Sequence, residues 1–179
     1  MRTEIRIAGM GGQGIILTGY ILGKTATIYQ NKFATLTQSY GPESRGSACS
    51  ACVIIGDEEI FYPHLTNTDL AVFMSQEGYH KFHKEAKDIA LLFLDSDLVQ
   101  PEENDKRKLC FIPATKIAES LGKKIVANMV MLGFLARHSQ IVSLEALREA
   151  IGATVSQKHL DLNLKALYQG YNYQLEKVR

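Results

Sequence analysis

The chain has 179 residues, of which 46% are hydrophobic and 22% are charged, and its formal net charge is +1. A chain of this length and apolar content can bury a sizeable core, which excludes extensive disorder. A net charge near zero gives no field that would gather nucleic acid or an anionic membrane surface, so no nucleic-acid partner is expected.

The first residues of the chain do not resemble a targeting segment. They lead directly into a strand-like stretch and lack the basic region and the continuous apolar region of a signal peptide. No apolar run elsewhere is long enough to span a bilayer. The 3 cysteines are odd in number and form no disulfide framework, which is typical of a reducing compartment. We therefore expect a cytoplasmic protein without membrane contact.

Strands and helices are predicted to alternate through the first part of the chain. Alternating apolar residues indicate strands, whereas apolar residues at helical spacing indicate helices. Gly41 and Pro42 continue neither element easily, which predicts a loop around them. In chain order, the predicted elements are a strand at residues 5–8, a helix at 15–29, a strand at 33–37 and a loop at 39–46.

A β-hairpin is predicted after this loop. Residues 47–55 have the composition of a strand, residues 56–58 indicate a turn, and residues 59–62 are interpreted as the returning strand. Two strands joined by so short a turn run antiparallel. The sheet is therefore expected to be mixed and not wholly parallel.

The rest of the chain continues this alternation before it becomes helical. Strands are predicted at residues 70–74, 89–94 and 109–112, with a helix at 76–84 between the first two. Helices are predicted at 114–121, 125–137 and 144–151, and a last helix has apolar residues on one side at Leu160, Leu164, Leu167, Tyr171 and Leu175. This order predicts one α/β domain over residues 1–179, a three-layer α/β/α sandwich with a mixed sheet and a Rossmann-like N-terminal strand–glycine loop–helix.

A glycine-rich motif lies between the first strand and the first helix. Residues 9–14 read GMGGQG and satisfy the pattern G-x-G-x-x-G in the structural context that gives it meaning. Glycines permit positive φ and let a ligand approach the backbone, and unpaired N–H groups at a helix start favour a phosphate. Gln13 adds an amide that could contact a ligand or a partner. The alternative is that these glycines only make a tight turn.

The surrounding sequence disfavours two kinds of phosphate ligand. A dinucleotide site usually has an acidic residue at the end of the second strand to bind the ribose. Residues 33–38 read FATLTQ and contain no acid, so NAD is disfavoured. The double glycine also resembles adenylating enzymes, but these too need a ribose-binding acid, and no convincing catalytic cysteine context is present.

A second motif, TQSYGPESRG, occupies residues 37–46. Its proline and glycines constrain a loop that presents polar side chains, and in a parallel arrangement this loop would lie beside the glycine motif. Arg45 has the planar fork that binds phosphate or carboxylate. Equally, Glu43 and Arg45 would pair with each other or with another subunit.

Together the two motifs resemble the gamma subunit, or gamma domain, of 2-oxoacid:ferredoxin oxidoreductases. Further similarity lies at residues 75–77 (SQE) and 128–133 (NMVMLG), so the resemblance spans most of the chain and thins beyond about Arg137. The second motif is most similar to the 2-oxoglutarate or general 2-oxoacid branch. Ser47 departs from the family, in which another small residue, often glycine, is usual.

The resemblance implies a role in a larger enzyme. Members of this family decarboxylate a 2-oxoacid, form an acyl-CoA and pass electrons to ferredoxin. Alpha and beta partner subunits would hold thiamine diphosphate and Mg, and a delta partner would hold iron–sulfur clusters. The gamma part covers the site and is associated with CoA, so this chain alone is expected to be inactive, with no catalytic residue and no metal ligand. The residues implied as cofactor contacts are Gly9, Gly11, Gly12, Gln13, Gly14, Ser39, Tyr40, Glu43 and Arg45.

Cysteine and histidine pairs suggest metal sites but fit other roles better. Cys49 and Cys52 are three apart on a predicted strand and would point to opposite faces. The chain has too few cysteines for the usual thiolate set of an iron–sulfur cluster, so small buried cysteines are predicted. His80 and His83 are one helical turn apart, but lysines surround them, which indicates a solvated helix face.

Two other functional interpretations stay open at this point. A free-standing nucleotide-dependent enzyme would bind ATP or NAD tightly by itself. A purely structural subunit would use the same loops to contact partners and would bind no cofactor.

Overall fold

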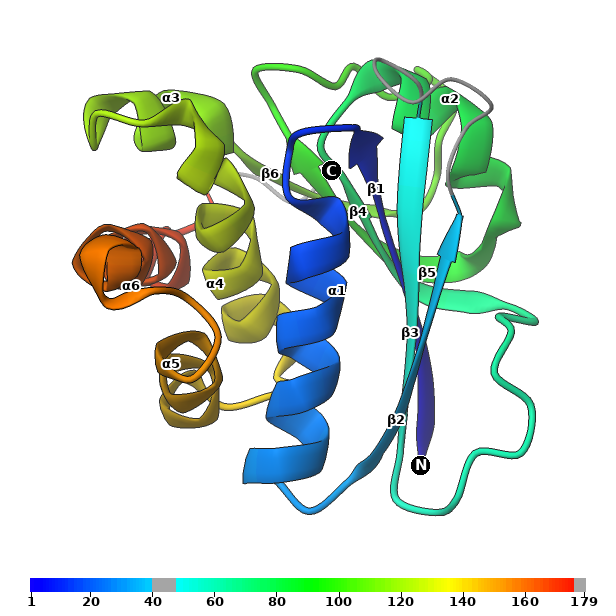
Figure 1. Ribbon diagram of the computed structural model, residues 1–179. Coiled ribbons are helices and arrows are strands. Elements are labelled where there is room, and N and C mark those ends of the chain that lie inside the picture. Colours follow the sequence, from blue (N-terminus) through cyan, green and yellow to red (C-terminus); the bar gives the residue numbers. More distant parts are fainter. Residues whose placement is uncertain (40–47, 176–179) are drawn as a thin grey trace.

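The computed structural model describes residues 1–39 and 48–175. Its centre is a six-stranded sheet with the order β2-β3-β1-β4-β5-β6 (Figure 1). The strands are β1 (Arg2–Met10), β2 (Phe33–Ser39), β3 (Ala48–Gly56), β4 (Thr68–Phe73), β5 (Ala86–Asp95) and β6 (Lys108–Ile112). β1, β4, β5 and β6 pair in parallel, whereas β3 runs antiparallel to β1 and to β2. The α/β class and the mixed sheet are therefore confirmed.

Helices lie close to the predicted positions. The α-helices are α1 (Ile15–Lys24), α2 (Gln76–Phe82), α3 (Ala114–Ser120), α4 (Ala127–Ser139), α5 (Leu144–Gly152) and α6 (Gln157–Asn172). A π-helical segment, η1 (Thr25–Tyr29), continues α1, and 3₁₀ turns η2 (His83–Glu85) and η3 (Lys124–Val126) follow α2 and precede α4. None of the helices within the described ranges is both long and apolar enough to cross a membrane.

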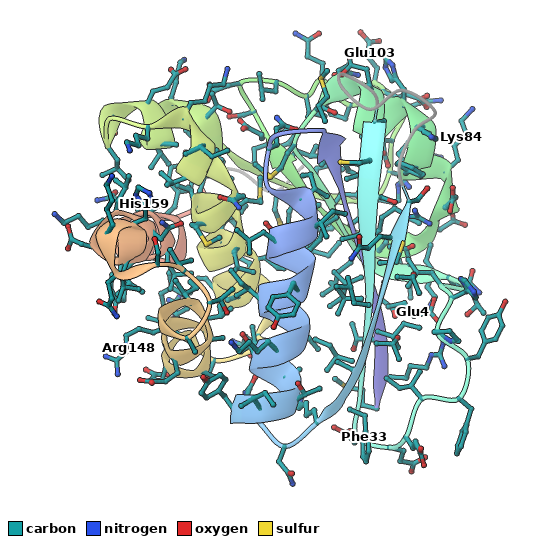
Figure 2. The ribbon with its side chains drawn as sticks, in the orientation of Figure 1. Glu4, Phe33, Lys84, Glu103, Arg148 and His159 are labelled. Carbon is teal, nitrogen blue, oxygen red and sulfur yellow. The ribbon has the colours of Figure 1, made fainter. Side chains whose placement is uncertain are left out.

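The two faces of the sheet are covered unequally (Figure 1). α1 and α4 pack on one face, and α5 and α6 pack against these helices and not against the sheet. Among the described helices, α2 packs on the opposite face, against β1, β3 and β4. Side chains alternate along a strand, so Ile5 and Ile7 join the larger core. Glu4 and Arg6 point to the thinly covered face, where Figure 2 shows Glu4 on the side away from α1.

Glycines allow two close approaches in the layer on the α1 side. A Cβ at Gly19 on α1 would lie 2.7 Å from the Cβ of Ala51 on β3. A Cβ at Gly170 on α6 would lie 2.6 Å from the carbonyl carbon of Val130 on α4. Real Cβ atoms do not approach other atoms this closely, so glycine lets α1 pack directly on the sheet and α6 directly on α4.

β3 forms its hairpin with β2 and not with the segment that follows it. Ser39 pairs with Ser50 in an antiparallel ladder, whereas residues 57–67 contain no strand. The returning strand predicted at residues 59–62 is therefore wrong. The other edge of β3 is hydrogen-bonded to β1, so β3 has no free edge to accept a third strand.

Candidate functional site

The glycine motif forms the turn between β1 and α1, at the carboxyl end of the parallel strands. Gly12 has a φ of 93° and Gly14 a φ of 74°, both in the left-handed region that favours glycine. Gly14 is the N-cap residue of α1, and the carbonyl of Gly14 accepts a hydrogen bond from the Thr18 N–H at 2.9 Å. The turn therefore exposes backbone at a helix start.

The glycines of this turn divide into an inward pair and an outward pair. A Cβ at Gly9 would lie 2.6 Å from the Ile15 Cδ1 atom, and a Cβ at Gly14 would overlap the side chain of Asn128. A Cβ at Gly11 or Gly12 would meet no atom within 4 Å. Gly9 and Gly14 thus face packed side chains inside the protein, whereas Gly11 and Gly12 leave the backbone open to an approaching group.

Gln13 ties this turn to the neighbouring strand. Its Oε1 accepts a hydrogen bond from the Met10 N–H at 2.7 Å, and its Nε2 donates to the Met74 carbonyl at 2.7 Å. Met74 directly follows β4, and its own N–H donates to the Ala8 carbonyl at 2.9 Å. The amide that the sequence suggested for a ligand or partner therefore makes one bond within the turn and one to the end of β4, and these bonds fix the shape and position of the turn.

Asn128, in the first turn of α4, contacts the glycine turn at Gly14. Its side chain is 3% exposed, and its Nδ2 donates to the Gly14 carbonyl at 3.4 Å. The NMVMLG segment at residues 128–133, noted in the sequence, thus begins in direct contact with the glycine motif. A small residue at Gly14 and an amide at Asn128 complement each other in space.

A cleft of about 290 Å³ opens beside the turn. Its lining residues come from the glycine turn, the end of β4, and the starts of α3, η3 and α4: Gly12, Gln13, Met74, Thr115, Lys124, Ile125 and Ala127. Met74, Ile125 and Ala127 supply apolar side chains, and Lys124 supplies a positive charge. Clefts at the carboxyl ends of parallel strands are the usual ligand sites of open α/β sheets.

A buried carboxylate forms hydrogen bonds with one of the residues that line this cleft. Asp95, at the end of β5, is fully buried, and its Oδ2 accepts hydrogen bonds from Thr115 Oγ1 at 2.6 Å and from Thr115 N at 3.1 Å. Burial raises the pKa of Asp95 above its ordinary value, although the bonds from Thr115 oppose that rise. Asp95 therefore positions Thr115, which lies in the first turn of α3 and lines the cleft.

The second motif is only partly within the described residues. Ser39 ends β2, and Ala48, which begins β3, pairs with Met10 next to the glycine turn. β2 and β1 both run antiparallel to β3, so Ser39 lies at the same end of the sheet as the glycine turn, with β3 between β2 and β1. The other predicted site residues of this motif lie outside the described residues: Tyr40, Glu43 and Arg45.

The cysteines have the structural role predicted for them. Cys49 and Cys52 are free and buried, and Cys49 joins the core under α1 while Cys52 pairs across the ladder with Arg6 on the opposite face. Burial raises the pKa of both thiols. Within the described ranges, no group of three or more His, Cys, Asp or Glu side chains is placed to hold a metal ion.

The predicted solvated face at His80 and His83 is wrong for His83. The His83 ring is 4% exposed and stacks on Tyr79 with 4.5 Å between ring centroids. Arg107 lies 3.1 Å from the His83 Nδ1. Burial lowers the pKa of His83, and the nearby Arg107 guanidinium adds to that lowering. His83 thus belongs to a buried network that fixes the end of α2.

Sequence reasoning missed Asp95, Thr115 and Lys124 as parts of the site. Thr115 lies in the first turn of α3 and Lys124 begins η3. The start of a helical segment after a strand or turn often lines a ligand cleft in α/β proteins. That signal was available in the sequence. Which helix starts meet the glycine turn depends on strand order, which the sequence did not specify.

The chain matches known proteins along nearly its whole length. Residues 4–173 match the family described as Pyruvate ferredoxin/flavodoxin oxidoreductase. The 2-oxoglutarate synthase subunit KorC of Methanocaldococcus jannaschii is 44% identical over 174 residues, which cover 96% of this chain and 93% of that protein.

Solved structures share the fold. The keto/oxoacid ferredoxin oxidoreductase gamma subunit of Geobacter sulfurreducens is 36% identical, with a TM-score of 0.84 over 94% of this chain and 96% of that chain. The 2-oxoglutarate:ferredoxin oxidoreductase of Magnetococcus marinus, solved with 2-oxoglutarate, coenzyme A and succinyl-CoA bound, is 22% identical. Its TM-score is 0.86 over 94% of this chain, which corresponds to 30% of that longer chain, and this likeness shows the fold alone.

Proposed function

Because the chain belongs to the pyruvate ferredoxin/flavodoxin oxidoreductase family, we propose that it is the gamma subunit of a 2-oxoglutarate:ferredoxin oxidoreductase. The identity of 44% to a 2-oxoglutarate synthase subunit, across almost the full length of both chains, supports the choice of substrate. The enzyme decarboxylates its 2-oxoacid oxidatively, transfers the acyl group to CoA and passes electrons to ferredoxin.

The catalytic cofactors belong to partner subunits in this proposal. Thiamine diphosphate and Mg lie on the alpha and beta subunits, and iron–sulfur clusters lie on a delta subunit. Cys49, Cys52 and Cys110 are free and buried, so their role in this proposal is structural. The chain contributes binding surface and not reacting groups.

The glycine turn and its cleft are the proposed contact with CoA. The observation that carries this proposal is the outward pair, Gly11 and Gly12, whose missing side chains leave open backbone beside the cleft. Backbone N–H groups at a helix start suit the phosphates of CoA. Met74 and Ile125 offer apolar walls, and Lys124 a positive charge, to the rest of a nucleotide-bearing ligand.

The remaining predicted residues keep supporting roles in the proposal. Gly9, Gln13 and Gly14 shape the turn, which explains why their identities matter without a ligand contact from each. Ser39 is the last residue of β2, at the same end of the sheet. The second motif, with Tyr40, Glu43 and Arg45, stays a proposed contact to CoA or to a partner subunit.

Gly11→Val in the co-expressed complex tests the CoA contact. Gly11 has no positive φ and open space around its Cβ position, so the variant is expected to fold and assemble normally. We expect the KM for CoA to rise about tenfold, equivalent to about 1.4 kcal/mol of lost binding, in a viologen-reduction assay with 2-oxoglutarate. The KM for 2-oxoglutarate should not change.

Gly23→Val is the matched control for this experiment. Gly23 also meets no atom within 4 Å, but it lies in the interior of α1, away from the turn. Its kinetics should equal those of the wild type. An unchanged KM for CoA in Gly11→Val would reject the CoA contact, and a tagged chain that purifies without thiamine- and cluster-bearing partners would reject the subunit assignment.

A further inference from the structure

The loop between β3 and β4, residues 57–67, displays two aromatic side chains to solvent. Phe61 is 87% exposed and Tyr62 is 55% exposed. The Tyr62 ring makes an edge contact with His64 at 5.5 Å between centroids. We call residues 57–67 the aromatic loop. It lies at the end of the sheet opposite the glycine turn (Figure 1).

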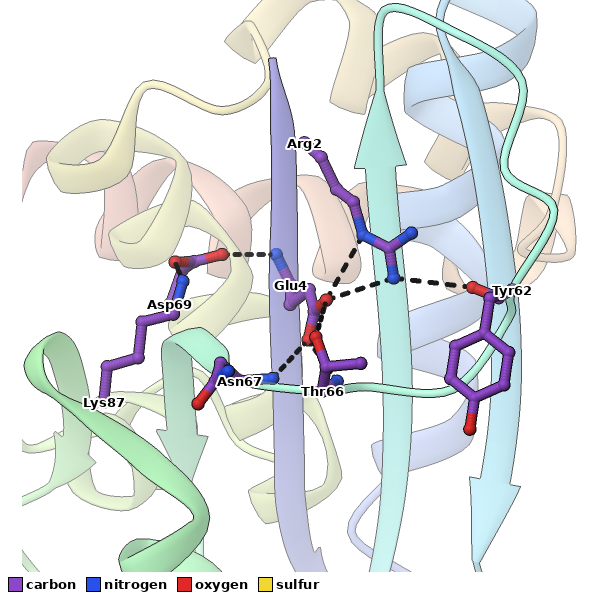
Figure 3. Close-up of polar contacts among 7 residues, drawn as sticks. All are labelled: Arg2, Glu4, Tyr62, Thr66, Asn67, Asp69 and Lys87. Atoms are coloured by element: carbon purple, nitrogen blue, oxygen red, sulfur yellow. Dashed lines mark hydrogen bonds and ion pairs between the residues drawn. The ribbon is translucent and has the colours of Figure 1, made fainter.

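A buried carboxylate fixes the aromatic loop to the sheet. Glu4 on β1 is 5% exposed and accepts hydrogen bonds from Thr66 N at 2.6 Å and from Asn67 N at 2.8 Å (Figure 3). The Thr66 hydroxyl donates to the same carboxylate at 2.9 Å. Charge-assisted bonds of this kind are stronger than ordinary hydrogen bonds. The returning end of the loop is therefore held firmly.

Further polar contacts hold the aromatic loop at Tyr62 and Asp57. Arg2 donates to Glu4 at 3.1 Å and to the Tyr62 carbonyl at 3.4 Å (Figure 3). At the other end, the Asp57 carboxylate accepts a hydrogen bond from the N-terminal amine of Met1 at 2.6 Å. The loop is thus positioned by polar bonds, while Phe61 and Tyr62 remain exposed. A loop backbone that is already positioned loses less conformational freedom when it binds a partner.

The charges of the loop indicate the chemistry of its partner. Arg2 and Asp57 are paired within the chain, but Glu58 and Glu59 are exposed and form no ion pair within the described residues. An acidic rim beside two aromatic rings repels nucleic acid and anionic lipid. It complements an apolar pocket bordered by lysine or arginine.

The size and symmetry of the loop argue against a second copy of this chain. One Phe and one Tyr bury roughly 150 to 250 Å² each, which is well below the roughly 800 Å² per partner of a stable interface. A two-fold contact would also bring Glu58 and Glu59 of the two copies together, which is unfavourable. The loop therefore suits a local anchor within a larger interface.

We propose that the aromatic loop docks Phe61 and Tyr62 into an apolar, basic-rimmed pocket on another subunit of the same oxidoreductase. The identity of that partner rests on the proposed function. The Magnetococcus marinus structure contains this fold as 30% of a longer chain, so there the same fold is joined to further protein. In this protein, noncovalent anchors such as the aromatic loop supply that connection.

The test compares assembly of tagged wild-type and variant chains co-expressed with their partner subunits. Phe61→Ala with Tyr62→Ala should reduce the amount of captured partner subunits at least tenfold. The melting temperature of the variant chain should equal that of the wild type, because neither side chain is buried. Tyr168→Ala is the matched control, since Tyr168 is an exposed aromatic residue on α6, far from the loop, and it should assemble normally.

Charge reversal separates docking from a general loss of apolar surface. The variant that combines Glu58→Lys with Glu59→Lys should capture fewer partner subunits than the wild type at low salt. Added salt screens the charges, so the difference in captured subunits between the variant and the wild type should become smaller. Wild-type assembly by the alanine variant would overturn the proposal, and wild-type capture by the lysine variant at low salt would overturn its basic-rimmed pocket. If the isolated wild-type chain dimerises and the alanine variant is monomeric, the aromatic loop binds a second copy of this chain, and the proposal is also overturned.

Failure of this proposal is distinguishable from failure of the proposed function. If the wild-type chain captures no partner subunits, both the docking proposal and the proposed function are rejected. Normal assembly by the aromatic variants, with a raised KM for CoA in Gly11→Val, removes the docking proposal alone. Lost assembly by the aromatic variants, with an unchanged KM for CoA in Gly11→Val, removes only the CoA contact.

Discussion

The glycine turn at residues 9–14 and the aromatic loop at residues 57–67 lie at opposite ends of β1 and are fixed by the same device. In each, one polar side chain bonds to backbone far away in sequence: Gln13 reaches the Met74 carbonyl, and Glu4 reaches the Thr66 and Asn67 amides. The first region then presents bare backbone, and the second presents aromatic rings. The hydrogen bonds of Gln13 and Glu4 set the shape of each region, whereas the exposed groups, bare backbone or aromatic rings, set the kind of partner that it can bind.

The two regions differ in how their backbone is constrained. Gly12 and Gly14 have positive φ values, whereas no residue of the aromatic loop does. The glycine turn therefore depends on residues that tolerate an unusual backbone. The aromatic loop depends on its bonds to Glu4. Changes to the backbone should break the first region, and changes to the tether should break the second.

The largest loss of stability is expected for Gly14→Ala. The new Cβ would face both a φ of 74° and the overlapping Asn128 side chain, so the free energy of unfolding should fall by about 3 kcal/mol. Urea denaturation measures this. Gly12→Ala, with a positive φ but open space, should lose only about 1 kcal/mol. Equal losses would mean that contact with Asn128 does not matter.

Glu4→Ala should come next. Removal of the carboxylate leaves the Thr66 and Asn67 amides without acceptors and Arg2 without its ion-pair partner, at a cost of about 2 to 3 kcal/mol. Hydrogen exchange at these two amides should accelerate. Glu4→Gln keeps one acceptor oxygen and should lose less. Unchanged exchange in both variants would show that Glu4 does not fix the loop.

Gln13→Leu should have a smaller effect than the loss of Glu4. The leucine cannot make the bonds to Met10 and Met74, and neutral bonds of this kind contribute about 1 to 2 kcal/mol together. The KM for CoA should rise while kcat stays close to its wild-type value, because the turn is misplaced and no reacting group is lost. A fall in kcat alone would contradict this positioning role.

Acid should weaken the aromatic loop selectively. Burial alone would raise the pKa of Glu4, but hydrogen bonds from Asn67, Thr66 and Arg2 outweigh it, so the pKa lies below its ordinary value of 4.5. The stability that Glu4 adds is therefore complete above that value and is lost as pH falls through the folded-state pKa. The stability difference between wild type and Glu4→Gln should shrink in that range. A difference that is constant with pH would contradict the ionised tether.

The smallest effect on stability is expected for Phe61→Ala. Phe61 is 87% exposed, so the free energy of unfolding should change by less than about 0.5 kcal/mol. A loss of partner binding in this variant could then be assigned to docking and not to a loss of folding stability. A loss of several times that size would mean that Phe61 packs on the chain itself and is not held ready for a partner.

Local sequence patterns predicted most elements because they reflect local physics. Apolar periodicity placed the strands and helices, and the G-x-G-x-x-G pattern placed the tight turn before α1. The hairpin was wrong because turn-forming residues after β3 indicate only that the chain bends. Whether a strand returns depends on a free edge, and β1 already occupies that edge of β3.

The sequence by itself determined the α/β class, the glycine turn, the separate buried cysteines and the family. Only the tertiary structure decided that Gly9 and Gly14 face inward while Gly11 and Gly12 face outward. It also brought Asn128 under the turn and Thr66 onto Glu4, contacts that span 114 and 62 residues of sequence. Backbone torsions and periodicity act between neighbours, whereas these contacts follow from strand order, which the whole chain must pack to define.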